Sequence, residues 1–181
     1  MQGIQILLDL LESQQKAINS EFSELSDEAL NWRPDAQANS IGITLWHLGR
    51  VADFVLSHRI EGRPVTEQRW FSGGWAEKTG YDPRGIGAGG MGILTGYTQE
   101  EVAALPAISS SDLLAYHNQV YEPLLDHLRQ LPDGGLEAPV PGEGEQHSAY
   151  FWFRIVLIDA VRHLGEMQAL KTLWQRQSRS S

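Results

Sequence analysis

The sequence predicts an all-α protein, an up-down four-helix bundle with a long irregular insertion between its second and third helices. Apolar residues recur at helical spacing over four segments, and no strand-like alternation competes with them. Four long helices joined by connections of unequal length are typical of a helical bundle. No repeat or linker divides the chain, so one domain is expected over residues 1–181. The four segments are residues 4–25, 41–61, 112–131 and 148–177.

Polar and proline residues mark where the first helices begin and end. Ser26 is a typical N-cap and predicts a short helix after the first long one, which Pro34 ends. Ser40 directly precedes the second long helix, and Gly62 and Pro64 follow it. The first three helices are therefore expected to be long, short and long, in that order.

The connection that follows is rich in glycine and aromatic residues. Residues 65–108 form the insertion, and most of it is expected to be irregular. One short helix is predicted at 98–105, because Thr98 with Glu101 three residues later matches a capping box. A loop of this length inside a compact domain is usually functional or covers something. The insertion is therefore expected to be functional or to cover another part of the molecule, and in an enzyme to shape and cover the substrate pocket.

The last two long helices carry one breaking signal and one unusually apolar run. Ser110 or Ser111 is expected to cap the third long helix, and Pro123 within it predicts a kink or a break. Residues 150–158 of the last helix are almost all apolar. This run predicts that the last helix is buried on most of its sides.

Composition limits the partners of the protein. The net charge is −9 and no basic run offsets it, so no nucleic-acid partner is expected. The chain has no cysteine, and therefore no disulfide and no thiolate to serve as nucleophile or metal ligand. Its first residues are typical of an amphipathic helix rather than a signal peptide, and no apolar run approaches the ~20 residues of a membrane span. A cytoplasmic protein without a membrane partner is expected.

Three polar residues interrupt the apolar stripes that should face the interior of the bundle. His47 lies amid apolar neighbours on the second long helix, and Asp159 and His163 do so on the last helix. Asp159 and His163 are four residues apart, so they project from one face within reach of one ion. Together with His47 they form a two-histidine, one-carboxylate set, which suits a divalent metal and leaves positions open for water or substrate.

The same three residues are also compatible with a protein that binds no metal. A buried Asp159 needs a positive partner, and Arg162 would serve as well as a metal ion. A histidine in an apolar stripe also occurs as a hydrogen-bonded core residue, and Asp159 with His163 also fits a simple helix-surface pair. His117 could face the interior of the bundle with Tyr121 and contact a substrate.

Two motifs of the chain resemble those of the DinB-like superfamily. The first is Leu30-Asn-Trp-Arg-Pro34, followed by Asn39-Ser-Ile41 and His47. It is similar to the family's L-x-W-R-P turn, N-S-I sequence and helix with a metal-binding histidine. The second is Asp159-Ala-Val-Arg-His163-Leu-Gly-Glu-Met167, similar to a closing motif that usually reads His-x-x-x-His-x-Gly-Gln-hydrophobic. The resemblance covers most of the chain except residues 65–108.

This resemblance implies an up-down four-helix bundle, often dimeric, that binds a divalent metal such as Zn, Ni, Mn or Fe. Carried over by position, His47 is the first ligand and His163 the third. Asp159 stands where the family usually has its middle histidine, and Glu166 where it usually has glutamine. Aspartate is a harder ligand than imidazole, so this change favours Mn, Fe or Mg over Zn or Ni, or else marks a member that has lost the site.

The family includes bacillithiol- and mycothiol-dependent transferases and isomerases. The resemblance therefore implies a metal-dependent enzyme, a thiol-dependent transferase or a related detoxification enzyme or hydrolase. Its expected partners are a small-molecule substrate, a low-molecular-weight thiol and a second copy of the chain in a homodimer. The alternative is a non-catalytic small-molecule-binding or stress-response protein that has lost the metal site. A third hypothesis is a helical protein that only mediates dimerisation.

Overall fold

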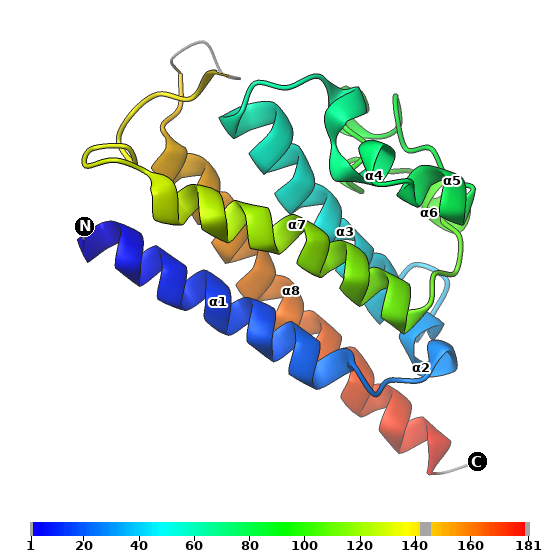
Figure 1. Ribbon diagram of the computed structural model, residues 1–181. Helices are drawn as coiled ribbons and strands as arrows, with labels where there is room; N and C mark the ends of the chain where they lie inside the picture. The colour runs from blue at the N-terminus through cyan, green and yellow to red at the C-terminus, as the bar shows by residue number, and fades with distance from the viewer. Residues whose placement is uncertain (1, 142–145, 180–181) are drawn as a thin grey trace.

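Four long helices dominate the computed structural model, which describes residues 2–141 and 146–179 (Figure 1). The prediction of an all-α protein is confirmed, because these residues form no strand beyond one isolated bridge between Pro139 and Ser148. The up-down order of the helices stays a prediction. The long helices are α1 (Gln2–Phe22), α3 (Ile41–Asp53), α7 (Ser110–Gln130) and α8 (Ala149–Ser178).

The core lies where these four helices meet. α1 and α3 each pack against both α7 and α8, so each long helix has two long neighbours. The side chains at the centre are apolar and fully buried, and the removal of their surface from water is a large stabilising contribution. They include Leu11 and Ile18 of α1, Leu45 of α3, Val120 of α7 and Phe153 of α8.

Serine side chains cap three helices, at the two positions that the sequence indicated, Ser26 and Ser40, and at Ser148. Ser26 accepts a hydrogen bond from the Ala29 N–H at the start of α2 (Asp27–Asn31). Ser40 caps α3 and Ser148 caps α8 in the same way. Each cap satisfies an N–H group that has no partner inside its own helix.

The cap of α7 corrects the sequence prediction. Ser109, not Ser110 or Ser111, accepts a hydrogen bond from the Asp112 N–H. The hydroxyl of Ser110 donates instead to the carbonyl oxygen of Phe22 in α1. Three consecutive serines offer the same local signal, and the packing against α1 decides between them.

The second long segment continues α3 with a different kind of turn. α3 ends at Asp53, and a π-helix, η1 (Phe54–Ile60), follows it directly. The sequence predicted one regular helix over residues 41–61, because apolar spacing does not distinguish the two. Short π segments within helices are frequent at functional sites.

The insertion is more ordered than predicted. Its predicted short helix is confirmed as α6 (Gln99–Ala103), with the capping box of Thr98 and Glu101 in place. Four further helical segments are too short to show periodicity in the sequence. Figure 1 shows two of them, α4 and α5, together beside α3 and α7. They are η2 (Val65–Glu67), α4 (Arg69–Ser72), α5 (Trp75–Thr79) and η3 (Ala88–Gly90).

Asp53 fastens the insertion to the end of α3. Its buried carboxylate accepts hydrogen bonds from the backbone N–H groups of Arg69 and Trp70, at 2.9 and 2.8 Å. It also accepts one from the Tyr116 hydroxyl of α7, at 3.0 Å. Nη1 of the buried Arg50 lies 3.4 Å from Oδ2 of the same carboxylate. A buried carboxylate needs such partners, so α4 and α7 are both held at this point.

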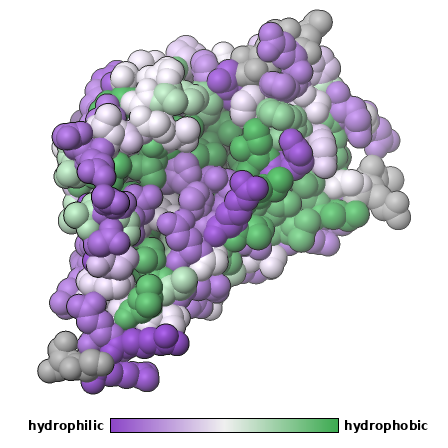
Figure 2. Space-filling model, turned by 180° about the vertical axis from the view of Figure 1, so that it is seen from behind, coloured by the Kyte–Doolittle hydropathy of each residue, from purple (hydrophilic) through white to green (hydrophobic). Residues whose placement is uncertain are grey.

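The last two helices differ from expectation in their continuity and burial. α7 runs through Pro123 without a break. The prediction that α8 is buried on most sides is wrong, since Tyr150, Ile158 and Val161 expose 49, 39 and 51% of their surface. Figure 2 shows apolar side chains on the rear face of the molecule. The long helices α1 and α3 cover only one side of α8, so its other side stays exposed to solvent.

No helix in the described ranges has both the length and the apolar character of a bilayer span.

Replacement of Asp53 by alanine is expected to lower the free energy of unfolding by about 3–5 kcal/mol, because Arg50 would stay buried without its counter-charge. Urea denaturation followed by circular dichroism measures this change. The matched control is Asp126→Ala, which removes an exposed pair with Arg129 and should cost less than about 0.5 kcal/mol. Equal losses in the two variants would show that the Asp53 contacts do not stabilise the fold.

Candidate metal centre

Two helices bring the three predicted ligands together. His47 lies on α3, and Asp159 and His163 lie one turn apart on α8, which packs against α3. One ligand atom from each of the three residues lies within 4.8 Å of the other two. The apolar stripes and the four-residue spacing in the sequence therefore selected three side chains that lie together in the fold.

Each of the two histidines has its Nε2 atom directed towards the Asp159 carboxylate. His47 Nε2 lies 3.2 Å from Asp159 Oδ2, and His163 Nε2 lies 3.5 Å from Asp159 Oδ1. The ring centroids are 5.0 Å apart, and the rings meet edge to face. Two imidazole nitrogens and a carboxylate thus converge on a small volume.

The second ring nitrogen of each histidine is already bonded. His47 Nδ1 lies 2.5 Å from the carbonyl oxygen of Ile93. Because a carbonyl oxygen only accepts hydrogen bonds, His47 Nδ1 carries a hydrogen and donates this bond. His163 Nδ1 lies 2.7 Å from Glu166 Oε2. A carboxylate oxygen also only accepts, so His163 Nδ1 is the donor of this hydrogen bond. Metal-binding histidines are usually oriented in this way, with the far nitrogen bonded to a carbonyl or carboxylate.

The charges of the site favour a cation beside its carboxylates. Burial acts to raise the pKa of Asp159, but the neighbouring His163 and His47 outweigh it and hold that pKa well below its usual range. Hydrogen bonding to Asp159 and then to Glu166 raises the pKa of His163 to about 9. Without a metal, the His163 ring is therefore protonated on both nitrogens and positively charged at neutral pH. A metal ion would supply positive charge in place of that proton.

The donor set fits a divalent cation. Asp159 Oδ2 is buried, and no donor in the described part of the chain is aligned for a hydrogen bond to it, although His47 is close. A buried carboxylate oxygen left in this way destabilises the folded state, and coordination would remove that penalty. Two imidazoles with one carboxylate suit Mn, Fe, Ni or Zn, and three protein ligands leave further positions for water or substrate.

Solvent reaches the site from one side. His47 is buried, whereas the side chains of Asp159 and His163 are 25 and 26% exposed. Arg162 is exposed, and the close charged contacts of Asp159 are with the two histidines. This arrangement argues against the alternative in which Arg162 neutralises Asp159.

The sequence does not reveal one of the two groups that accept hydrogen bonds from the histidine Nδ1 atoms. The Ile93 carbonyl belongs to the backbone of the insertion, so no side-chain pattern reveals it. Glu166 could be found, because it lies on the stripe of His163 three residues further along α8, which is contact spacing in a helix.

His117 and Tyr121 lie on α7, outside the group of three. Both side chains are buried, and their rings stack with centroids 4.1 Å apart. Neither the His117 nitrogens nor the Tyr121 hydroxyl has a hydrogen-bond partner among the residues described. Burial lowers the pKa of His117 to about 4, so this ring is neutral at neutral pH. Burial, and after it the charge of Asp159, raises the pKa of Tyr121, which places this ring within electrostatic reach of the site.

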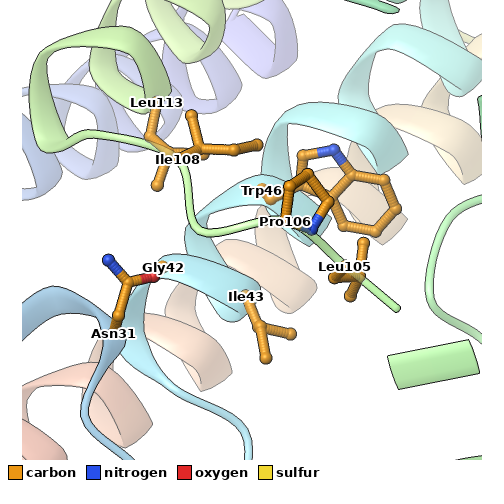
Figure 3. Close-up of a pocket in the computed structure, with 8 residues that line it drawn as sticks. All are labelled: Asn31, Gly42, Ile43, Trp46, Leu105, Pro106, Ile108 and Leu113. Atoms are coloured by element: carbon orange, nitrogen blue, oxygen red, sulfur yellow. The ribbon is translucent and has the colours of Figure 1, made fainter. Parts of the chain in front are cut away.

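A small cavity lies beside the start of α3 (Figure 3). Trp46 of α3 and the segment Leu105–Pro106 form part of its wall, and its volume of about 10 Å³ holds roughly one water molecule. None of the three candidate ligands lines it. This cavity is therefore too small for a substrate and does not serve the candidate metal centre.

The fold and the site define a helical protein with a His/Asp/His group between two of its helices. The sequence model of the DinB superfamily matches residues 10–167, and the chain belongs to this superfamily. The crystal structure of a conserved protein from Enterococcus faecalis is similar, with a TM-score of 0.76 and 18% sequence identity over 93% of this chain and 95% of that one. At this identity, the likeness shows the fold alone. A search of curated proteins gives no match.

In the metal-free protein, the free energy of unfolding should fall as the pH rises from about 6.5 to about 9. The pKa of His163 is about 9 in the folded protein and near the ordinary ~6.5 when unfolded. Its stabilising contribution is therefore complete below pH ~6.5 and is lost as the pH rises through the folded pKa. Urea denaturation in the presence of a chelator measures the fall, which His163→Asn should lack. Parallel pH curves for the two proteins would contradict this assignment.

Proposed function

We propose that the protein is a divalent-metal-dependent enzyme of the DinB superfamily and that His47, Asp159 and His163 hold the metal. The orientation of the two rings carries this proposal. Both Nε2 atoms face Asp159 while both Nδ1 atoms are bonded elsewhere, to Ile93 and Glu166. Once His163 has lost its extra proton, one nitrogen of each ring and a carboxylate oxygen can bind the same ion.

The residues of the site prepare it for chemistry in distinct ways. A bound divalent metal supplies a Lewis acid and lowers the pKa of a coordinated water or thiol. Asp159 compensates part of the cation's charge. Glu166 accepts a hydrogen bond from Nδ1–H of His163 and so makes Nε2 a stronger electron-pair donor to a metal ion. The exposed side of Asp159 and His163 leaves room for a small molecule to approach.

The proposed reaction class is transfer involving an external thiol. The chain contains no cysteine, so a thiolate at this site has to come from outside the chain, which fits a low-molecular-weight thiol. The metal-lowered pKa would make that thiol a nucleophile near neutral pH. Hydrolysis by a coordinated water is the other reaction that the same ligand set supports.

Metal content tests the proposal directly. Protein purified without a histidine tag is expected to contain close to one metal ion per chain by elemental analysis, and His163→Ala should lose it because one of three ligands is gone. The matched control is His58→Ala, since His58 contacts the Arg63 carbonyl and lies outside the group of three. A wild-type protein that stays empty after incubation with Mn, Fe, Ni and Zn would contradict the proposal and favour a non-catalytic binding protein.

Asp159→His should change which metal the site prefers. Imidazole is a softer ligand than carboxylate, so the variant is expected to shift the preference from Mn or Fe towards Zn or Ni by at least about ten-fold in relative affinity. Competition between Mn²⁺ and Zn²⁺, measured by elemental analysis after dialysis, reports this ratio for both proteins. An unchanged ratio would mean that Asp159 does not coordinate the ion.

A further inference from the structure

Arg50 connects α3 to two separate parts of the insertion. Its side chain is fully buried, one helical turn beyond His47. Nη2 donates to Gln68 Oε1 at 2.7 Å, and Nε donates to the Gly92 carbonyl at 3.1 Å. Nη1 lies beside Asp53. The planar guanidinium reaches these three separated acceptors from three different nitrogens, whereas the donors of a lysine ammonium all lie on one atom.

The turn that Arg50 holds is the same turn that holds His47. The Gly92 carbonyl binds Arg50, and the carbonyl of the next residue, Ile93, binds His47 Nδ1. His47 and Arg50 are three residues apart on α3 and therefore neighbours on one face. Two adjacent backbone carbonyls of the insertion are thus fixed by two adjacent side chains of the helix.

This turn has a conformation that its surroundings impose. Gly92 has φ +63°, and a Cβ there would lie 2.4 Å from the Pro83 carbonyl oxygen. Leu94 has φ +74°, and it is the one residue other than glycine with positive φ among those described. Side chains disfavour this region, so such a turn persists only where outside contacts maintain it. The bonds from Arg50 and His47 are contacts of this kind.

We propose that Arg50 is a positioning residue for the candidate metal ligand His47 and that it acts through the Gly92–Leu94 turn. This inference rests on the proposed function, in which His47 binds the metal. Arg50 fixes the turn, the turn fixes the Ile93 carbonyl, and the carbonyl fixes the ring of His47 with Nε2 towards Asp159. Groups behind a ligand typically change metal affinity by 10- to 100-fold when they are removed.

Two variants disturb this chain of contacts from opposite ends. Arg50→Lys keeps the charge beside Asp53 but cannot reach all three acceptors. Gly92→Ala leaves α3 intact and displaces the turn, because the added Cβ meets Pro83. The matched control is Gln119→Ala, which removes a bond between α7 and Trp75 of the insertion and leaves the turn alone. Circular dichroism confirms that each variant folds, and Gly92→Ala carries the test if Arg50→Lys does not.

The first measurement is the affinity for Zn²⁺ and for Mn²⁺, by competition with a chelator. Arg50→Lys and Gly92→Ala should bind both ions at least about ten-fold more weakly than wild type, and Gln119→Ala should match wild type. The second is nitrogen-15 NMR of the His47 ring in the metal-free protein. The Nδ1 proton should exchange slowly in wild type and Gln119→Ala, and rapidly in the other two variants.

The two measurements separate this inference from the proposed function. If wild type binds neither ion but the Nδ1 proton behaves as expected, the positioning role stands and the metal-dependent enzyme does not. If wild type binds metal and Arg50→Lys and Gly92→Ala match it in affinity and in Nδ1 exchange, the positioning role is overturned and the proposed function is untouched.

Discussion

The buried contact between Arg50 and Asp53 is the interaction on which the arrangement of the insertion depends. Two charges removed from water destabilise a fold unless their remaining donors and acceptors are satisfied. Here the insertion supplies those partners, through the backbone of Arg69 and Trp70, the Gln68 side chain and the Gly92 carbonyl. Together with the Tyr116 hydroxyl of α7, the insertion therefore stabilises the pair, and the pair in turn holds the insertion in place.

This dependence gives the candidate metal centre two unlike halves. His47 is buried, and its ring is held by a turn that the insertion and Arg50 maintain. His163 is partly exposed, and Glu166 on its own helix holds it. The half on α3 is thus fixed by contacts distant in sequence, whereas the half on α8 is fixed by local spacing. A change in the insertion should reach the site through His47 first.

The parts of the structure that the sequence predicts are those set by local rules. The caps at Ser26 and Ser40 and the capping box at Thr98 follow from neighbouring residues alone. His47, Asp159 and His163 could be selected because a polar residue in an apolar stripe is visible in one dimension.

The parts that the sequence does not predict depend on contacts between distant segments. The four unpredicted helical segments of the insertion are each three to five residues long, and bonds such as those from Asp53 to α4 hold them. The Ile93 carbonyl is a backbone group and leaves no trace in the side-chain pattern. The outer face of α8 was predicted to be buried because its apolar content shows hydrophobicity, whereas burial depends on how many helices surround it.

Two carboxylates act on one residue, His163. Asp159 and Glu166 stand where the resemblance implies histidine and glutamine, and both lie against the His163 ring. Together they raise the pKa of His163 to about 9, so a proton and a metal ion compete for the same nitrogen at neutral pH. The added negative charge attracts a divalent cation more strongly, while the proton has to leave before it binds. Metal affinity should therefore increase with pH up to about 9.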